Sequence, residues 1–318
     1  MPYTRRELAA LALAAFPAAH LLETLPVAAF QTRPGSKVRG VMIGMNVPYN
    51  FGGRNVPVDE IIRNCVELGI SGVELRTQPV EAFLGAPASP AGGGRAGAEP
   101  DAAQKASADA LRQWRLSVAM DKVQPVRKKF EDAGILIEIV KVDGILTMPD
   151  DIVDYEFQLA KALGARAIST EINVTQTQRL GQFADKHRMM VGYHGHATTT
   201  TADFETSFGY AAHNGANLDI GHFVAGQNTS PVPFITRHHD RITHIHVKDR
   251  KKNNGANVPF GQGDTPITEV LQLIRDNKWN IQATIEFEYP VPEGSSRMGE
   301  LKKCIDYCRA ALGPQVRT

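Results

Sequence analysis

The sequence predicts a single (β/α)8 barrel, a TIM barrel, that occupies residues 35–318. Short apolar runs rich in β-branched residues alternate with longer helical patterns, and no part of the chain contains strands alone. The runs number eight, which is the strand count of a closed parallel barrel. A doubly wound open sheet is the alternative, but no GxGxxG motif follows the first strand.

Residues 1–34 have the pattern of a twin-arginine-type signal peptide and leader. Arg5 and Arg6 directly precede an apolar Ala/Leu-rich stretch, and residues 27–29 (VAA) offer the small side chains that a signal peptidase needs. The apolar stretch is short and is interrupted by polar residues, so it does not predict a membrane-spanning helix. We therefore expect a periplasmic or secreted protein without stable membrane insertion after signal cleavage. An ordinary amphipathic N-terminal helix is the alternative.

The eight expected strands follow one another from the end of this leader. Each is an apolar run of strand length bounded by polar or turn-forming residues. They cover residues 38–45, 72–76, 135–142, 165–170, 188–194, 216–220, 242–248 and 282–288.

Helical patterns fill the intervals between these strands. Examples are VDEIIRNCVELG, MDKVQPVRKKFEDAG, DYEFQLAKALG, TQRLGQFADKHR and ITEVLQLIRDNK. Several end in glycine, which tolerates the left-handed conformation that terminates a helix.

The segment 85–107 interrupts this alternation, because 16 of its 23 residues are Gly, Ala or Pro. Such a composition cannot bury enough apolar surface to form a core of its own. The segment follows the carboxyl end of the second strand, on the face where barrel active sites are built. A mobile lid and a tolerated flexible insertion are both consistent with it.

Composition and charge favour a small-molecule partner. The chain is 42% hydrophobic and 22% charged, which suits a globular core, and its net charge is +1. A protein of this charge has no general basic field for a polyanion, so we expect no nucleic-acid partner. Formation of a homo-oligomer is left open.

Carboxylate and imidazole side chains follow five consecutive expected strands, from the fourth to the eighth. In a parallel barrel the carboxyl ends of all strands open into one mouth, so these groups are expected to meet there. Mixed carboxylate and imidazole groups are typical of a divalent-metal site. They are Glu171, His194, His196, Asp219, His222, His244, His246, Glu286 and Glu288.

Four stretches occur in order at these strand ends: GYHGH, LDIGH, HIHVKDR and IEFEYPVPEG. With them, residues 38–312 resemble the xylose-isomerase-like TIM-barrel family. That family contains sugar isomerases and epimerases, with relatives among inosose dehydratases and apurinic endonucleases. The same stretches resemble an exported subgroup described as sugar phosphate isomerase/epimerase. The resemblance implies one divalent ion, Mn²⁺, Mg²⁺, Co²⁺ or Zn²⁺, held by Glu171, Asp219, His246 and Glu286.

Other residues at the mouth receive substrate roles. One face of the seventh expected strand carries His244, His246 and Lys248, because they are spaced two residues apart. The family pattern selects His246 as the ligand. Lys248 would then lie at the rim and contact substrate. His194 is a substrate contact or a rival ligand, and His222 is a substrate clamp or proton shuttle, with capping of the following loop as its alternative role.

These residues predict a metal-dependent isomerase or epimerase that acts on a sugar or keto-sugar through an enediolate intermediate. Glu171 and Glu286 resemble the acid–base pair of the family's epimerases. A lyase or hydratase that eliminates a β-substituent from a 3-keto glycoside or inosose is the alternative, and a non-enzymatic sugar-binding barrel is a third. The endonuclease relatives need further histidine ligands on the second and third strands, which read GVELR and ILIEIVKV here.

Overall fold

The structure is a computed structural model, and it describes residues 33–88 and 101–313 of the 318-residue chain. The predicted leader lies outside the described residues except for its last two positions. Residues 89–100 of the predicted insertion also lie outside them.

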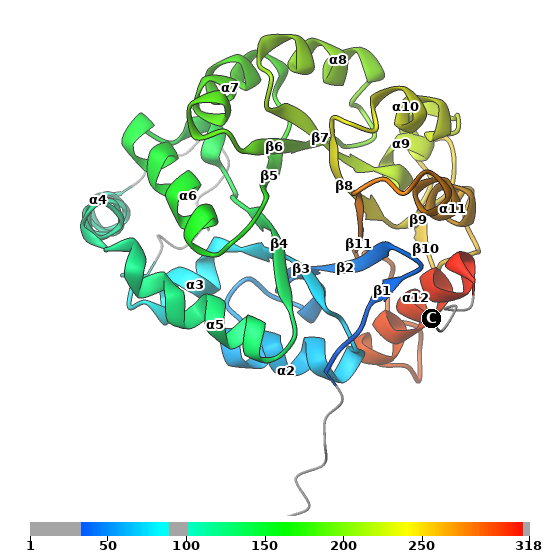
Figure 1. Cartoon of the computed structure of the whole chain (residues 1–318), viewed down its shortest axis with the longest axis horizontal. Helices are drawn as coiled ribbons and strands as arrows, with labels where there is room; N and C mark the ends of the chain where they lie inside the picture. Colours follow the sequence, from blue (N-terminus) through cyan, green and yellow to red (C-terminus); the bar gives the residue numbers. More distant parts are fainter. Residues whose placement is uncertain (1–32, 89–100, 314–318) are drawn as a thin grey trace, which may run out of the picture. The chain divides into compact units, whose positions relative to one another are not determined.

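Eight parallel strands form a closed ring (Figure 1). Each strand pairs with the next along the ring, and the ring closes where the last strand pairs with the first. The predicted (β/α)8 barrel is therefore confirmed. In ring order the strands are β2 (Val41–Val47), β3 (Gly72–Arg76), β4 (Leu136–Lys141), β5 (Ala167–Glu171), β6 (Met190–His194), β7 (Asn214–Asp219), β8 (Ile242–Val247) and β11 (Gln282–Ile285).

The first and last strands differ from their expected ranges. Arg39 and Gly40 both have positive φ and form a turn, so the run expected at 38–45 divides into two pieces. The first piece, β1 (Lys37–Val38), folds back antiparallel onto β2. The last strand ends at Ile285, and Glu286 therefore lies just beyond it in the mouth.

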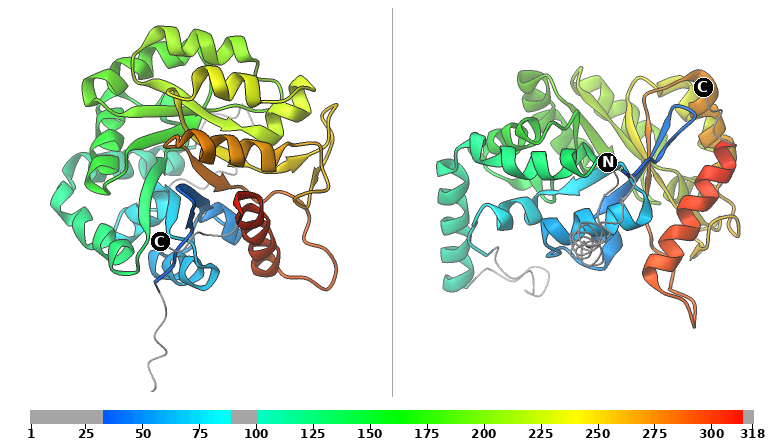
Figure 2. Two further views of the ribbon diagram at one scale, coloured as in Figure 1. Left: turned by 45° about the vertical axis from the view of Figure 1, so that its right-hand side comes forward. Right: turned by 60° about the horizontal axis from the view of Figure 1, so that its bottom comes forward.

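Helices cover the outside of the strands (Figure 2). In α2, Ile61, Cys65 and Leu68 are buried at helical spacing, and Gly69 ends the helix with φ of 68°. The helices are α2 (Val58–Leu68), α3 (Thr77–Phe83), α4 (Ala102–Ser117), α5 (Gln124–Asp132), α6 (Asp150–Ala162), α7 (Val174–His187), α8 (Thr201–Tyr210), α9 (Ile220–Gln227), α10 (Val232–His238), α11 (Ile267–Asn277) and α12 (Arg297–Leu312). Among the described residues, none of these helices combines the length and apolar character needed to cross a bilayer.

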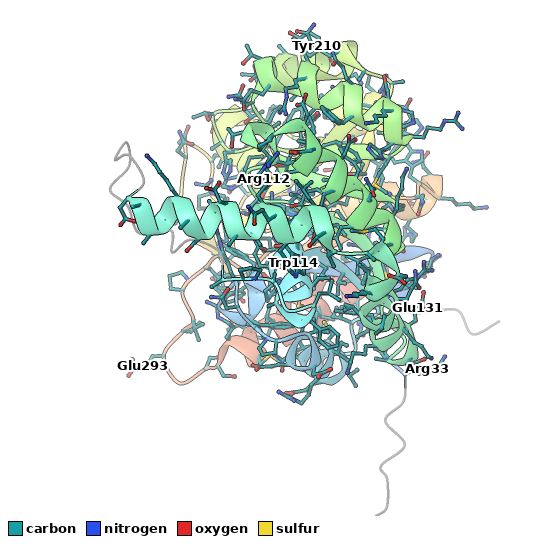
Figure 3. All side chains as sticks on the ribbon, turned by 90° about the vertical axis from the view of Figure 1, so that its left-hand side faces the viewer. Arg33, Arg112, Trp114, Glu131, Tyr210 and Glu293 are labelled. Atoms are coloured by element: carbon teal, nitrogen blue, oxygen red, sulfur yellow. The ribbon has the colours of Figure 1, made fainter. Side chains whose placement is uncertain are left out.

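The end of the predicted insertion is helical. Residues 102–107 form the first turns of α4, because Asp101 and Gln104 make a reciprocal capping box and the alanines that follow favour helix. Figure 3 shows α4 lying along the outside of the barrel, with Arg112 and Trp114 on opposite sides. Arg115 holds this helix to the barrel by two hydrogen bonds to Glu81, of 2.7 and 3.0 Å.

Polar side chains fill part of the barrel's interior. Asn46 and Glu74 lie opposite each other on β2 and β3, and both are fully buried. Asn217 on β7 and Thr284 on β11 are also fully buried, so hydrogen-bonding groups lie beneath the mouth. Buried polar groups need partners, which makes this interior a support for the site above it.

Candidate metal and sugar site

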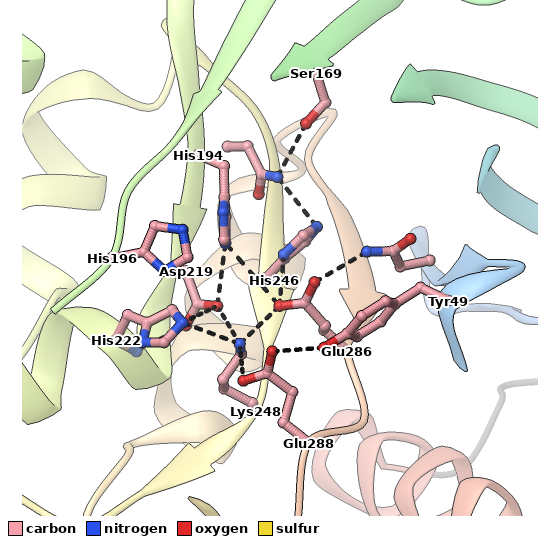
Figure 4. Close-up of polar contacts among 12 residues, drawn as sticks. Tyr49, Ser169, His194, His196, Asp219, His222, His246, Lys248, Glu286 and Glu288 are labelled. Atoms are coloured by element: carbon pink, nitrogen blue, oxygen red, sulfur yellow. Dashed lines mark hydrogen bonds and ion pairs between the residues drawn. The ribbon is translucent and has the colours of Figure 1, made fainter. Parts of the chain in front are cut away.

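Four buried side chains converge at the carboxyl ends of consecutive strands (Figure 4). His194 ends β6, Asp219 ends β7, His246 lies near the end of β8, and Glu286 follows β11. Asp219 is paired in register with His246, which places these two at the same height in the barrel. One nitrogen or oxygen atom from each of the four lies within 4.8 Å of the others.

The donor atoms of this group fit a divalent cation. His246 Nδ1 and Glu286 Oε2 are buried and 3.1 Å apart, and Lys248 Nζ lies 2.6 Å from the same Oε2. Glu286 is fixed through its other oxygen, which accepts a 2.9 Å hydrogen bond from Asn46 Nδ2. Two imidazole nitrogens and two carboxylate oxygens suit Mn²⁺, Co²⁺ or Zn²⁺, and the carboxylates also suit Mg²⁺.

The position of Asp219 is fixed by β7 and by α9, the two elements that it joins. It is the last residue of β7 and the N-cap of α9, where its Oδ1 accepts a 2.7 Å hydrogen bond from the backbone N–H of His222. Its Oδ2 is therefore directed to the cluster, 3.4 Å from His194 Nε2.

Lys248 supplies positive charge at the same place. Its ammonium lies 2.9 Å from Asp219 Oδ2, 2.6 Å from Glu286 Oε2 and 2.6 Å from Glu288 Oε2. Burial acts to lower the pKa of Lys248, but the three carboxylates raise it above its ordinary value. The sequence predicted a rim lysine, whereas the structure buries it in the centre, where it competes with a cation for two of the same oxygens.

Glu171 lies on the far side of His194 from this group. Its Oε2 is 3.1 Å from His194 Nδ1 and 2.7 Å from His196 Nε2, and its Oε1 is 2.7 Å from Lys141 Nζ. Burial acts to raise the pKa of Glu171, but the two imidazoles and Lys141 hold it well below the usual range. Of the four predicted ligands, Asp219, His246 and Glu286 come together directly, whereas Glu171 is separated from them by the His194 ring.

His222 is held between two cations. Arg250 Nη1 donates to its Nδ1 at 2.6 Å, and Lys248 Nζ lies 3.2 Å from its Nε2. Burial lowers the pKa of His222 to about 4, so the ring is neutral. Arg250 and Lys248 therefore place an N–H donor at each of the two ring nitrogens, and Nε2 also lies 3.8 Å from Asp219 Oδ2.

A buried carboxylate orients His246 from below. Glu74 Oε2 is 2.6 Å from His246 Nε2, and Glu74 Oε1 is 3.4 Å from His244 Nε2. Because a carboxylate only accepts, His246 Nε2 carries a proton and Nδ1 faces Glu286. Burial acts to lower the pKa of His246, but Glu286 and Glu74 raise it to about 10. His244 lies one layer deeper than His246, as expected, and burial lowers its pKa to about 4.

The sequence analysis did not assign Glu74, Asn46, Tyr49 or Arg250 to the site. A usable signal was present for Glu74, since a charged residue in the middle of the apolar strand GVELR points either to solvent or to a buried partner. Asn46 is a similar polar interruption in VMIGMNV. Tyr49 begins a short 3-10 helix after β2, and Arg250 ends the two-residue strand β9 (Asp249–Arg250) after β8, so both lie beyond the barrel strands whose alternation was used.

Comparison with known proteins supports the fold. A family model described as xylose isomerase-like TIM barrel matches residues 156–311. A search of curated proteins found no significant match. Among solved structures, the probable 3-DHS dehydratase AsbF of Bacillus anthracis superposes with a TM-score of 0.58 at 15% identity, over 86% of this chain and 97% of its own.

Two further structures share the fold to the same extent. A xylose isomerase domain protein of Planctomyces limnophilus has a TM-score of 0.58 at 15% identity, over 86% of this chain and 97% of its own. A xylose isomerase-like TIM barrel protein of Mycobacterium smegmatis, solved in complex with magnesium, has a TM-score of 0.56 at 13% identity, over 86% and 96%. The predicted resemblance is confirmed: residues 156–311 match the model of the xylose isomerase-like TIM-barrel family, and the barrel as a whole has the fold of these structures.

Proposed function

We propose that this protein is a divalent-metal-dependent isomerase or epimerase that acts on a sugar or keto-sugar by proton transfer next to a carbonyl group. The observation that carries the proposal is the convergence of four buried ligand side chains at the mouth of the barrel. Asp219, His246 and Glu286 would hold the ion, with either His194 or Glu171 as the fourth ligand. When bound, the ion supplies stabilisation of negative charge on the substrate's carbonyl oxygen.

Glu171 and Glu286 are the candidate proton-transfer groups. They lie on opposite sides of the His194 ring, with Glu171 Oε2 3.1 Å from Nδ1 and Glu286 Oε2 4.0 Å from Nε2. Burial acts to raise both pKa values, but neighbouring imidazoles and lysines lower them, so both carboxylates are ionised at neutral pH. Epimerisation needs one of the pair as a base that removes the proton from one face, and the other, after taking up a proton from solvent, as an acid that delivers it to the opposite face.

Lys248 and His222 are the candidate substrate-binding groups of this cluster. Both lie beside Asp219, where oxygens of a polyhydroxylated substrate would be bound. His222 is neutral and its ring is fixed by Arg250, so it can orient a hydroxyl group without adding charge.

Elimination of a β-substituent from an oxidised glycoside or inosose is the second candidate. Lys248, Glu288 and Tyr49 form a chain next to Glu286, with Lys248 Nζ 2.6 Å from Glu288 Oε2 and Tyr49 OH donating to Glu288 Oε1 at 3.0 Å. Burial raises the pKa of Tyr49 to about 12, so both ends of the chain carry protons that a departing oxygen requires.

The test is incubation of the metal-loaded full chain with free, phosphorylated and 3-keto sugars in D₂O, followed by NMR. An isomerase or epimerase incorporates deuterium at a carbon next to the carbonyl. A lyase instead releases the β-substituent and gives an unsaturated product. If no sugar of the panel exchanges and none is cleaved, the proposed function is wrong.

Two variants separate binding from chemistry. Asp219→Ala should lose about one metal ion per chain, whereas Asp109→Asn, an exposed aspartate on α4, should keep it. Glu286→Gln should retain part of the metal affinity and lose about 10²- to 10⁴-fold in turnover, because it keeps an oxygen ligand and removes the base. Wild-type exchange in Glu286→Gln would leave Glu286 as a ligand only.

A further inference from the structure

A cavity of about 470 Å³ adjoins the cluster on the side of Tyr49 and Glu288. Its size is typical of sites for small organic ligands. The residues that matter for its chemistry are Tyr49, Arg54, Asn257, Phe287, Glu288 and Arg297.

Glu288 forms the wall that the cavity shares with the cluster. Its Oε2 is 2.6 Å from Lys248 Nζ and also accepts a 3.4 Å hydrogen bond from Asn257, while its Oε1 accepts from Tyr49. Figure 4 shows Tyr49 and Glu288 side by side at the edge of the cluster. One side chain therefore separates a ligand in the cavity from Lys248, whose charge Glu288 shares with Asp219 and Glu286.

Two arginines in the wall of the cavity have a weak acidic partner or none among the described residues. The Arg297 guanidinium lies 5.0 Å from the centre of the Phe287 ring and donates one long hydrogen bond, of 3.3 Å, to the carbonyl of Asn50. Over the part of the chain that the structure describes, it makes no ion pair. Arg54 is weakly paired, since its Nη1 lies 3.9 Å from Asp143 Oδ2 and its side chain is 67% exposed.

This arrangement fits an oxyanion better than a neutral group. A guanidinium that is fixed against an aromatic ring keeps its planar set of N–H donors available, and that set matches the oxygens of a carboxylate or a phosphate. Tyr49 and Phe287 provide apolar ring surface beside it, as sugar-sized ligands require for their C–H groups.

We propose that this cavity binds the anionic group, a carboxylate or a phosphate, of a sugar whose carbonyl end is processed at the cluster. The inference rests on the proposed function for the carbonyl end only. It narrows the substrate class to acidic or phosphorylated sugars, with Arg297 and Arg54 as specificity-determining residues.

Binding is measured by calorimetry on the metal-free full chain with three probes, D-glucose, D-gluconate and D-glucose 6-phosphate. We expect at least one anionic probe to bind about tenfold or more tightly than D-glucose, as charge-assisted hydrogen bonds to arginine predict. The two anionic probes distinguish carboxylate from phosphate. Equal affinity for all three probes would overturn the proposal.

Arg297→Gln should abolish most of this preference, and Arg297→Lys, which keeps the charge but not the planar donor set, should restore part of it. Arg112→Gln is the matched control, because Arg112 pairs with Asp151 on the outside of the barrel. An anion preference that survives Arg297→Gln in a folded protein would also refute the assignment.

These outcomes are separate from those of the proposed function. An Arg297-dependent anion preference without deuterium exchange in any sugar supports the cavity and rejects the isomerase. Exchange in neutral sugars that is unaffected by Arg297→Gln supports the isomerase and rejects the cavity.

Discussion

Glu74→Gln tests whether the carboxylate beneath the cluster prepares His246 to bind a cation. The carboxylate accepts a hydrogen bond from His246 Nε2 at 2.6 Å, so Nδ1 is left as the ring atom that faces Glu286. Glutamine has nearly the same volume but no charge. The variant therefore removes the stabilisation of the Nε2 proton without opening a cavity.

The expected effect is a loss of about 10- to 100-fold in metal affinity, as for carboxylates that orient ligating histidines elsewhere. That loss corresponds to about 1.4 to 2.8 kcal/mol. The upper part of this range applies here, because both side chains are 0% exposed and water cannot screen or replace the lost negative charge.

The assay is calorimetric titration of chelator-treated protein with Mn²⁺ or Zn²⁺, together with ¹⁵N NMR of the histidine rings. In wild-type protein the metal-bound His246 should carry its proton on Nε2. Glu156→Gln is the matched control, since Glu156 is equally buried but lies on α6, where its charged contact is Arg115. A folded Glu74→Gln protein that binds metal within about threefold of wild type would refute the role assigned to Glu74.

Three more predictions follow from the same contacts. His194→Asn and Glu171→Gln should differ in metal content, and the variant that loses the ion identifies the fourth ligand. Metal binding should release about one proton, because the raised pKa of His246, about 10, keeps a proton on Nδ1 that the ion must displace. The metal affinity should therefore rise about tenfold for each pH unit below pH 10. Calorimetry in buffers of different ionisation enthalpy measures the number of protons released. Burial raises the pKa of Glu156 from 4.5 to about 8 despite the charge of Arg115, so the folded protein loses stability as the pH rises through that range. In chemical denaturation, the free energy of unfolding of Glu156→Gln should exceed that of the wild type by at most about 5 kcal/mol at pH 8.5 and should equal it at pH 4.5. An equal gain at both pH values would contradict this reasoning.

The barrel was predictable because its determinants are local. Each strand is a short apolar run, and the helices end at residues such as Gly69 that accept the left-handed conformation. The run near residue 38 was misjudged because the turn at Arg39 and Gly40 is hidden among apolar neighbours, and arginine rarely adopts positive φ.

The members of the site were predictable, but their partners were not. Asp219 and Glu286 could be found because a carboxylate at the end of a parallel strand must face the mouth. The burial of Lys248 could not, because its position depends on three carboxylates from two other strands whose register is set by the whole barrel. The separation of Glu171 from the group by the His194 ring is likewise a matter of side-chain packing.

The charges of the cluster favour the cation proposed for it. The cluster contains four carboxylates, Asp219, Glu286, Glu288 and Glu74, and among the residues that the structure describes their positive partners are Lys248 and the protonated ring of His246. Buried charge of one sign is costly, and three of these four carboxylates are at most 5% exposed. A divalent ion that displaced one proton from His246 would add one net positive charge and leave Lys248 paired with Glu288. The cluster would then approach neutrality without losing the carboxylates that act as bases, and this balance favours a metal site over a permanent lysine–carboxylate network.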